Sequence, residues 1–571
     1  MRISSVFAII VVCLALFSPV FSQETQTEAG SRVLRVADPV VGEYVVGLNG
    51  HPSQRRTRPE IAQIAGSLVM DTGGELRNIY SHAIQGFSVR LSEEAAENLS
   101  RNPSVAFVEE VSRGELLSGE CTPSSIVDWH LDRINQRSLP LDGQTGQPGD
   151  GQGVNIYVLD TGVDTTHPEF GGRASLAYII PELSGSCASD DCHGHGTQVA
   201  GVAAGENYGI ASAANVLGVR VVRSFMVGNE WFAEAQSNWT LSGIDWVIGQ
   251  KLASPNTPTA MNISIWHGAS EALDSAVRNA IAAGIIVTTG SGNDYTKPPS
   301  TGSPQRVLDV ITVAGTDPDD YVGFYNTSLG PEIDFFTPGK SITTAQTSDQ
   351  GSDDYICTGG TSISAPMAAG VAAIYLSSNP GGSPAEVGRY MVHNATANKV
   401  QPYPSHPNLG GAPNLLLYSS LTSTPPAPPI SELRRMRWDS PLKHFYTTDT
   451  AEVSSKQVAG WVLELTQCKV YEDHVAGFMP LHRYREPTDD NYFYTTDFTE
   501  GVNVGWINEG VAGYVFPYDS TDPDAISLYR FVNPVDPPLR HFYTTDYSEG
   551  SSSGFTFEFT QCKVFPATYV P

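Results

Sequence analysis

The sequence predicts an α/β domain with a parallel sheet flanked by helices, a small α+β domain before it and a β-rich domain of three repeats after it. Three observations carry this prediction: near-continuous apolar runs within residues 120–420, a strand–helix–strand–strand–helix–strand pattern within residues 40–110, and three copies of the motif Tyr-Thr-Thr-Asp after residue 430. A chain of 571 residues is too long for one hydrophobic core, so several folded domains are expected.

The predicted parallel sheet rests on five apolar runs: VNIYVLD (154–160), NVLGVRVV (215–222), AMNISIW (260–266), AGIIVTTG (283–290) and VITVAGT (310–316). They lack the polar alternation of a half-exposed strand, and such runs are typical of parallel strands buried on both faces. The stretches LSGIDWVIGQKL and ALDSAVRNAIAAG between them predict helices. This alternation is the pattern of an α/β domain.

Residues 40–110 predict the small domain. The stretches EYVVGL, AIQGFSVRL and VAFVEEV are expected to be strands, and RPEIAQIAGSLVMDTGG a helix that ends in glycine. The stretch SEEAAENLSRNP predicts a capped helix with Pro103 beyond its end. This order of elements predicts a ferredoxin-like fold.

The N-terminal segment and the net charge indicate where the chain works. Residues 1–22 contain Arg2, then an apolar run, then small residues at Val20 and Ser22, which is typical of a secretory signal peptide. A membrane anchor is the alternative, but the run is short for a membrane span. We therefore expect a secreted, extracellular protein with no membrane partner, and the formal net charge of −28 argues against a nucleic-acid partner.

The C-terminal part begins with a Pro- and Ser-rich linker over residues 421–430 and continues with three motifs, HFYTTDTAE, YFYTTDFTE and HFYTTDYSE. In each motif a glutamate follows the aspartate by three residues, and this spacing predicts a helix-capping box. The pairs are Asp449/Glu452, Asp497/Glu500 and Asp546/Glu549. Their aromatic residues could stack on a glycan or matrix ligand, but a small β-rich core also needs aromatics, and the core interpretation is favoured.

Six cysteines remain after the signal segment, which contains Cys13, and an even number in an oxidising compartment predicts disulfides: Cys121, Cys187, Cys192, Cys357, Cys468 and Cys562. Zinc is the alternative, since Cys187 and Cys192 lie close to His193, but disulfides are favoured. Cys187 with Cys192 would close a local loop. Cys468 and Cys562 occupy matching TQCKV positions, so a disulfide between them could close the repeat array.

Four polar residues stand at strand ends or helix starts of the central domain. Asp160 ends the run VNIYVLD, His195 opens HGTQVAGVAAG, Asn293 follows AGIIVTTG, and Ser362 opens a helix in GGTSISAPMAAG. A serine hydroxyl becomes a nucleophile only when a positioned and oriented base accepts its proton. Singly, Asp160 could be a strand-end cap, His193 could be the base and Asn293 could be a turn residue, but their joint occurrence favours a catalytic site.

These motifs, in the order Asp, His, Ser, resemble the subtilisin-like serine proteases, and the proteinase K branch in particular. The segments HPEFGGRA, YGIASAANVLGVRVV, FTPG and PNLLLY resemble family segments, and residues 40–110 resemble the inhibitory propeptide of the family. The resemblance implies that Ser362 is the nucleophile, His195 the general base and Asp160 its orienter. It also implies an oxyanion hole made by Asn293 and the Ser362 backbone amide, and chemistry without a required cofactor.

The resemblance implies a substrate-binding strand made of Ser264, Ile265, Trp266, His267 and Gly268. The sequence of this strand departs from the family pattern. Trp266 and His267 stand where the family has glycines that line the cleft. We expect the indole to occupy part of the first pocket and His267 to narrow it, so that small side chains are favoured next to the cut. The alternative is a strand bulge that turns Trp266 outward.

Other features are weaker signals. The resemblance implies a structural calcium at Asp334 with the carbonyls of Leu308 and Val310, against the alternative of a plain structural aspartate. Five glycosylation acceptor motifs occur, of which Asn262 is discounted because it lies in a buried-strand pattern: Asn98, Asn238, Asn262, Asn326 and Asn394. The C-terminal repeats also resemble tyrosine-rich repeat modules at the ends of some secreted enzymes.

Together these features predict a secreted serine endopeptidase, acting through an acyl-enzyme on Ser362, that is made as a self-processing precursor. Its partners would be protein or peptide substrates and its own inhibitory propeptide. The alternative is a protease-derived binding or matrix protein whose occluded cleft turns over little substrate. The expected domains are a signal peptide (1–22), a propeptide (23–118), a catalytic domain (119–420), a linker (421–430) and the repeat domain (431–571), with the maturation cut between Val111 and Cys121.

Overall fold

The computed structural model describes residues 33–569 apart from 50–54, 71, 120, 122–127, 323–326, 351–353, 404–407, 421–429, 440–441, 473–477, 488–489, 497–505, 517, 519, 521 and 534–539. The expected signal peptide and nearly all of the expected linker lie outside the described residues. Within the described part of the chain, no helix is both long and apolar enough to cross a membrane.

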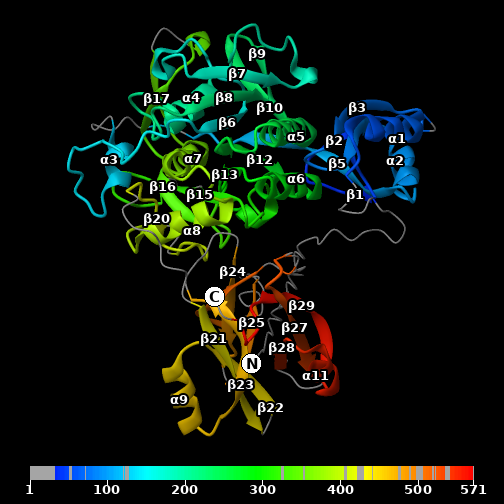
Figure 1. Cartoon of the computed structure of the whole chain (residues 1–571), viewed down its shortest axis with the longest axis vertical. Coiled ribbons are helices and arrows are strands. Elements are labelled where there is room, and N and C mark those ends of the chain that lie inside the picture. The colour runs from blue at the N-terminus through cyan, green and yellow to red at the C-terminus, as the bar shows by residue number, and fades with distance from the viewer. Residues whose placement is uncertain are drawn as a thin grey trace, which may run out of the picture.

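The small N-terminal domain has the predicted order of elements (Figure 1). Its antiparallel sheet has the strand order β5-β2-β4-β3, and its apolar face packs against two helices. The elements are β1 (Val33–Leu34), β2 (Pro39–Leu48), α1 (Arg58–Met70), β3 (Glu75–Tyr80), β4 (Gly86–Arg90), α2 (Glu93–Ser100) and β5 (Val105–Leu116). Helix α2 begins as predicted, because the Ser92 side chain accepts a hydrogen bond from the Ala95 amide.

The central domain is built on a nine-stranded sheet, in which every pair is parallel except β19 with β20. In order across the sheet the strands are β19 (Thr396–Ala397), β20 (Leu415–Leu416), β16 (Phe335–Pro338), β15 (Ile311–Thr316), β13 (Ile286–Gly290), β11 (Thr259–Ile263), β6 (Asn155–Asp160), β8 (Asn215–Arg220) and β7 (Ala174–Ile179). The helices are α3 (Trp129–Asn135), α4 (His195–Ala204), α5 (Ser237–Ala253), α6 (Glu271–Ala282), α7 (Thr361–Ser378) and α8 (Pro384–Asn394). All five predicted apolar runs contribute strands to this sheet, as the pattern of two-sided burial requires.

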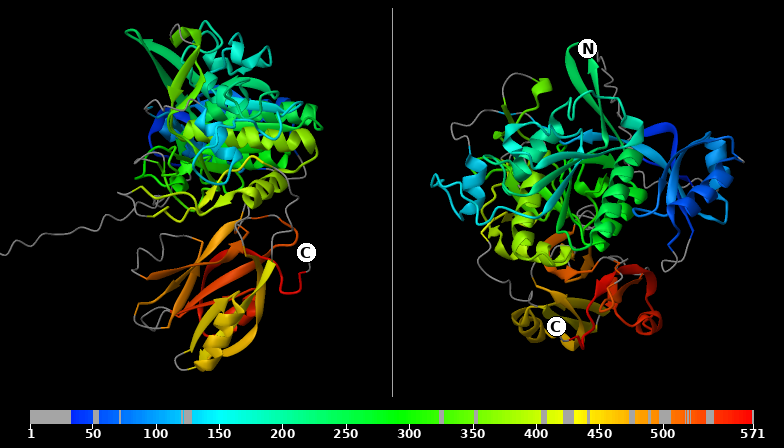
Figure 2. Two further views of the ribbon diagram at one scale, coloured as in Figure 1. Left: turned by 90° about the vertical axis from the view of Figure 1, so that its left-hand side faces the viewer. Right: turned by 45° about the horizontal axis from the view of Figure 1, so that its top comes forward.

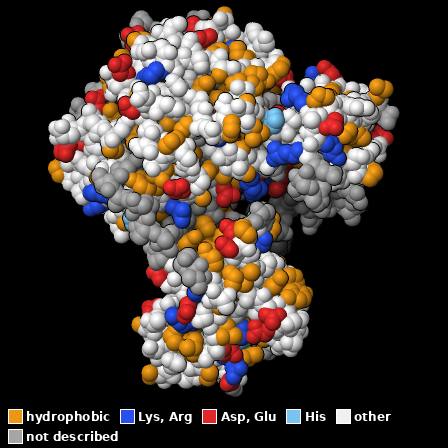
Figure 3. Space-filling model, in the orientation of Figure 1, with side chains coloured by type: hydrophobic (Ala, Val, Ile, Leu, Met, Phe, Trp, Pro, Cys, Tyr) orange, Lys and Arg blue, Asp and Glu red, His pale blue; other side chains and the backbone are white. Residues whose placement is uncertain are grey.

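A second sheet joins the two domains through β5. This strand lies between β10 (Glu230–Gln236) and β12 (Ile265–Gly268) of the central domain. The sheet also contains β9 (Val222–Val227) and β14 (Gly302–Ser303), while β17 (Ile342–Ala345) and β18 (Tyr355–Thr358) form a separate hairpin. Figures 1 and 2 show the N-terminal domain, in blue, beside the central domain at this junction, and Figure 3 shows Lys and Arg side chains gathered along it.

The C-terminal domain consists of antiparallel strands with short helices, shown in yellow to red in Figure 1. Its elements are β21 (Ile430–Asp439), β22 (Leu442–Thr447), α9 (Thr450–Val458), β23 (Val462–Tyr471), β24 (Met479–Arg485), β25 (Tyr492–Thr495), β26 (Ile507–Val515), β27 (Ile526–Asn533), β28 (Arg540–Thr544), α11 (Tyr547–Ser552) and β29 (Thr556–Val564). The three motifs supply β22, β25 and β28, each paired with the strand that precedes it.

One tyrosine from each motif meets the others in a closed ring at the centre of this domain. The hydroxyl of Tyr446 donates to the Tyr543 carbonyl (2.7 Å), that of Tyr494 to the Tyr446 carbonyl (2.7 Å) and that of Tyr543 to the Tyr494 carbonyl (2.6 Å). Each hydroxyl also accepts a hydrogen bond from a backbone amide of the ring. Because every polar atom of the ring is paired, the burial of three tyrosines costs little.

In the predicted capping boxes, the aspartate cap is confirmed but the return hydrogen bond from the glutamate is not. Asp449 and Asp546 cap their helices, but Glu452 does not return a hydrogen bond to the Asp449 amide, which donates to the Thr447 hydroxyl instead. Glu452 binds the Arg483 guanidinium of the next repeat. The glutamates therefore join repeats, a role that spacing along the chain cannot reveal. Asp497 and Glu500 lie outside the described residues.

The disulfides agree with the sequence in part. Cys187 and Cys192 form the predicted local bridge, and Cys121 pairs with Cys357. The suggested bridge between Cys468 and Cys562 is wrong in this structure, because both are free thiols buried in the core of the C-terminal domain. Burial raises the pKa of both thiols, so the unreactive thiol form is favoured.

Candidate active site

Three elements of the parallel-sheet region carry the predicted catalytic side chains, and two of these side chains are in direct contact. Asp160 is the last residue of β6, His195 the first of α4 and Ser362 the second of α7. Gly360 lies directly before α7 and has a φ of 109°. This conformation favours glycine and lets the chain turn sharply into the helix. His195 Nδ1 lies 2.8 Å from Asp160 Oδ1 and 2.9 Å from Oδ2, and both side chains are buried.

The other end of the histidine is left without a partner. His195 Nε2 and Ser362 Oγ are both buried and make no hydrogen bond to any residue the structure describes. Other buried side-chain atoms of the described residues are also unpaired, so it is position that distinguishes these two: one belongs to the histidine bonded to Asp160, the other to the serine whose amide binds the Leu117 carbonyl. The ring of His193, the alternative base, lies 6.4 Å from that of His195, and burial lowers its pKa; the histidine bonded to Asp160 is His195.

A peptide carbonyl of the chain itself lies at the predicted oxyanion site. The carbonyl oxygen of Leu117 accepts hydrogen bonds from Asn293 Nδ2 (2.6 Å) and from the Ser362 backbone amide (3.1 Å). Asn293 Oδ1 in turn accepts from the amide (3.0 Å) and the hydroxyl (3.0 Å) of Thr361, which orients the donor. Two fixed donors on one carbonyl oxygen are the arrangement that stabilises a tetrahedral oxyanion.

The residues before Leu117 lie along the predicted substrate-binding strand. In the antiparallel pairing of β5 with β12, Leu116 faces Ile265, Glu115 faces Trp266 and Gly114 faces His267. The Leu117 amide continues the ladder by donating to the Ser264 carbonyl (3.3 Å), and Gly268, the last residue of β12, pairs with Gly302 of β14. The end of the N-terminal domain thus binds as an extended peptide substrate would.

The two large residues of β12 both point inward. The strand has no bulge and Trp266 is 8% exposed, so the alternative of an outward indole does not hold. The indole packs against Gly302 and against Gly292, which precedes the oxyanion donor by one residue: a Cβ built on either glycine would lie within 3 Å of the ring. His267 lies beside Gly114 rather than beside Leu117. Our expectation that His267 narrows the first pocket is therefore wrong, and the residue whose carbonyl lies at the oxyanion donors is a leucine rather than the small residue we expected.

The chain after Leu117 stays close to the catalytic helix. The Ser118 carbonyl accepts from Asn293 Nδ2 (2.9 Å), and the Gly119 amide donates to the Gly359 carbonyl (2.8 Å). Two residues later, Cys121 is joined to Cys357 at the start of the turn into α7. Residues on both sides of the Leu117–Ser118 bond are therefore held at the site.

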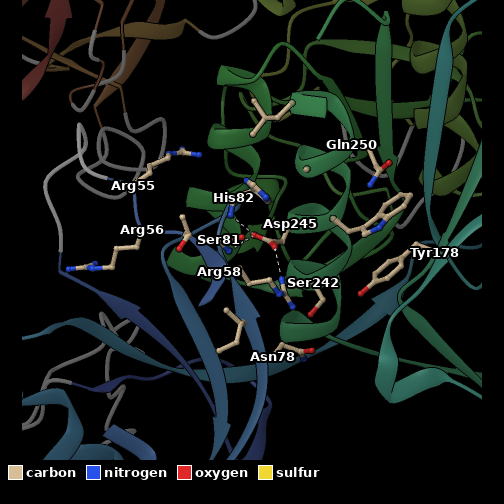
Figure 4. A pocket seen from close by; sticks show the side chains of 15 residues that line it. Arg55, Arg56, Arg58, Asn78, Ser81, His82, Tyr178, Ser242, Asp245 and Gln250 are labelled. Carbon is tan, nitrogen blue, oxygen red and sulfur yellow. Dashed lines mark hydrogen bonds and ion pairs between the residues drawn. The ribbon is translucent and has the colours of Figure 1, made fainter. Parts of the chain in front are cut away.

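Two buried carboxylates hold the N-terminal domain on the central domain, and neither was predicted from the sequence. Glu109 of β5 accepts hydrogen bonds from the Ser270 hydroxyl (2.5 Å) and the Glu271 amide (2.8 Å) at the start of α6. Asp245 of α5 accepts from the amides of residues 81–83 of the N-terminal domain at 2.6–2.9 Å (Figure 4). The available signal was an acidic residue between apolar ones: Asp245 within LSGIDWVIGQKL, and Glu109 beside Glu110 within VAFVEEV.

The metal predictions gain no support. Asp334 Oδ2 accepts a hydrogen bond from the Thr312 amide (2.8 Å), which is the kind of contact expected of the alternative, a structural aspartate. Within the described residues, no group of three or more His, Cys, Asp or Glu side chains could hold a metal ion. The zinc alternative also fails at Cys187 and Cys192, since their sulfurs form a disulfide.

Comparisons with known proteins agree with this geometry. The model of the Subtilase family matches residues 151–411, that of Peptidase inhibitor I9 matches residues 43–114, and that of a domain of unknown function (DUF5648) matches residues 433–565. The chain is 34% identical to Alkaline serine exoprotease A of Vibrio alginolyticus, over 66% of this chain and 68% of that one. It is 35% identical to Extracellular serine proteinase of Thermus sp. (strain Rt41A), over 61% of this chain and 78% of that one.

A solved structure of a cold adapted subtilisin-like serine proteinase is 37% identical, and the match covers 52% of this chain and 99% of that one with a TM-score of 0.44. Fold and site together define a serine protease with an N-terminal inhibitor domain. The chain belongs to the subtilase family.

Proposed function

We propose that this chain is a secreted serine endopeptidase made as a precursor that cuts itself between Leu117 and Ser118. One observation carries the proposal: the Leu117 carbonyl oxygen accepts hydrogen bonds from both Asn293 and the Ser362 amide, while the preceding residues pair with β12. The bond lies inside the range 111–121 expected from the sequence. It moves the boundary between propeptide and catalytic domain by one residue, so that the mature chain begins at Ser118.

The proposed reaction follows from the paired and unpaired atoms of the site. His195 Nε2 takes the proton of Ser362 Oγ as this oxygen attacks the Leu117 carbonyl carbon, and Asp160 stabilises the resulting imidazolium through Nδ1. The oxyanion is held by Asn293 and the Ser362 amide. Collapse breaks the bond to the Ser118 nitrogen, which takes the proton from His195, and water then hydrolyses the acyl-enzyme by the reverse proton transfers.

After the cut, both products have reasons to stay. The propeptide remains bound through β5, Glu109 and Asp245, and acts as an inhibitor until it dissociates. The new N-terminus is three residues from Cys121, whose disulfide to Cys357 limits the reach of Ser118 to roughly 10 Å from that cysteine. The first residues of the mature chain therefore stay near Ser362 until this disulfide opens or the chain swings aside.

Secretion and glycosylation complete the proposal. Residues 1–22 supply the signal peptide, and relatives are named as an extracellular proteinase and as an exoprotease. Among the acceptor motifs, Asn98 is exposed, whereas Asn238, Asn262 and Asn394 are buried, so Asn98 is the site we assign. Asn326 lies outside the described residues.

Two further predictions concern ligands. Calcium at Asp334, Leu308 and Val310 stays a prediction, tested by thermal unfolding with and without a chelator. A glycan or matrix ligand of the C-terminal domain also stays a prediction, and the burial of the motif aromatics favours a structural role for them.

The test of the catalytic assignment is labelling with a fluorophosphonate, which reacts only with an activated serine. We expect the secreted protein to be labelled and the Ser362→Ala variant to be unlabelled. The rival function, a binding or matrix protein with an occluded cleft, is favoured by the inward Trp266 and His267. It predicts that the fully matured wild-type protein remains unlabelled.

A further inference from the structure

The fourth residue before the proposed cut, Gly114, is paired with strands of the central domain on both sides. Strand β12 flanks it on one side, where it faces His267, and strand β10 flanks it on the other, where it faces Ala235. The neighbouring positions differ: Leu117 is buried, Leu116 is half-buried and Glu115 is exposed. Gly114 is itself half-buried, so the direction that a side chain would take there is given by the atoms that its Cβ would meet.

The imidazole of His267 occupies the space that a side chain at this position needs. A Cβ built on Gly114 would lie 2.4 Å from His267 Cε1, 2.5 Å from Nδ1 and 3.0 Å from the Trp266 carbonyl oxygen. Carbon atoms in van der Waals contact lie about 3.5–4.0 Å apart, so even a methyl group overlaps the ring. The backbone itself does not require glycine here, because Gly114 is not among the residues with positive φ.

The ring cannot easily move away. His267 is fully buried, and its Nε2 atom lies 2.9 Å from the hydroxyl of Thr240 on helix α5. Burial also lowers its pKa to about 3, so the ring is neutral. To make room for a side chain, it would have to break the hydrogen bond to Thr240 inside a packed interior, which has little free volume.

We propose that His267 is a specificity-determining residue that restricts the fourth residue before the scissile bond to glycine. The proposal rests on the proposed function and names its substrate class: peptides with glycine at the fourth position and an aliphatic residue, such as leucine, directly before the cut. The third position is free, since Glu115 points to solvent. A pocket contact of this kind is worth about tenfold to a hundredfold in kcat/KM.

The full-length precursor gives the first test, since it presents its own substrate segment. Gly114→Ala should slow the appearance of mature protein by at least about tenfold, and adding His267→Gly should restore processing to the rate of His267→Gly alone. Gly66→Ala is the matched control, because a Cβ there meets nothing within 4 Å. Rescue by the second change shows that the added methyl group acts through the His267 ring, and the peptide test below separates this from a folding defect.

Two results of this test would overturn the proposal. One is that Gly114→Ala matures at the wild-type rate. The other is that it matures slowly but is not rescued by His267→Gly.

The mature protein gives the second test, with quenched fluorescent peptides of sequence RGELLSGE and RAELLSGE. We expect the glycine peptide to be cut at least about tenfold faster, and His267→Gly to reduce that ratio to below about threefold by accelerating the alanine peptide. Equal rates for the two peptides with the wild-type protein would contradict the proposal.

If neither peptide is cut, the proposed function fails and the subsite is then judged by binding. The peptides RGELL and RAELL serve for this in calorimetry. Tighter binding of the glycine peptide would support the assignment of His267, and equal binding would overturn it.

Discussion

The proposed active site of the central domain and the tyrosine ring of the C-terminal domain both bury polar side chains, but only the ring pairs every polar atom of those side chains. In the C-terminal domain the hydroxyls of Tyr446, Tyr494 and Tyr543 each donate to one backbone group and accept from another. At the proposed active site, His195 Nε2 and Ser362 Oγ have no partner among the described residues. The closed ring holds a fold together, whereas the open pair is available for a reaction.

The interface between the propeptide and the central domain contains a polar side chain that is paired only while the propeptide is bound. Glu109 is buried and accepts hydrogen bonds from Ser270 and from the start of α6, yet the domain that carries it is expected to leave. A polar group there has to be paired in one state and solvated in the other. We therefore expect large catalytic effects at His195 and Ser362, and pH-dependent binding of the propeptide at Glu109. In the tyrosine ring we expect effects on stability alone.

The largest effect is expected at the nucleophile. Ser362→Ala should lower peptide hydrolysis by more than about 10⁴-fold, because no other group can form the acyl-enzyme. Because the variant cannot cut itself, its propeptide and mature chain would be produced as two separate chains. Progress curves with the quenched peptide RGELLSGE would then measure the rate of hydrolysis. Retention of more than about one hundredth of the activity would show that the open pair is not the reactive site.

The oxyanion donor should come next. Asn293→Ala should reduce kcat by about 10²–10³-fold, since removing one donor costs that much, while KM changes little. The C-terminal ring supplies the control, because Tyr494→Phe should leave both kinetic constants unchanged. A large rise in KM with constant kcat would instead assign Asn293 to ground-state binding.

Dissociation of the cut propeptide should depend on pH through Glu109. Burial raises the pKa of this carboxyl to about 7, and hydrogen bonds from Ser270 and the backbone amides only partly oppose this. In the released propeptide the carboxyl has its ordinary pKa of about 4.5. The bound state therefore holds the proton more tightly, so binding is strongest below the ordinary pKa and weakens as pH rises to 7, by up to about tenfold per pH unit.

Gel filtration of the cut, unseparated protein at pH 5 and pH 8 would follow this release. Glu109→Gln is the control and should bind with little dependence on pH. Tighter binding at pH 8 than at pH 5 in the wild-type protein would contradict the account.

The smallest effect is expected in the ring. Tyr494→Phe leaves the amide and carbonyl of Tyr446 without their buried partner, which should lower the free energy of unfolding of the C-terminal domain by about 1–3 kcal/mol. Thermal unfolding monitored by tyrosine fluorescence would show it. An unchanged melting temperature would mean that the ring does not stabilise the domain.

The sequence predicted the strands of the parallel sheet because two-sided burial leaves a readable apolar run. It did not reveal that the run AMNISIW divides: β11 ends at Ile263, and β12 begins at Ile265 in a different sheet. It also predicted that β5 would end near Val111, whereas the strand continues to Leu116. Residues 113–116 pair with the central domain, and pairing across domains has no periodic signature in the sequence.

The candidate site was predictable to a similar degree. Asp160, His195, Asn293 and Ser362 could be proposed from local motifs and the resemblance that those motifs carry, because each stands at or just beyond the end of an element. The direction of the His267 side chain could not be predicted, because it depends on strand register. A shift of one residue along β12 decides whether a side chain lies near the residue directly before the cut or near the fourth residue before it.

The central claim is that the Leu117–Ser118 bond lies in the catalytic site, and the N-terminus of the secreted mature protein tests it most directly. Sequencing or intact mass spectrometry of this species should give Ser118 as the first residue, and the Ser362→Ala precursor should remain uncut. A mature chain that begins at another residue, or normal processing of the Ser362→Ala precursor, would contradict the account.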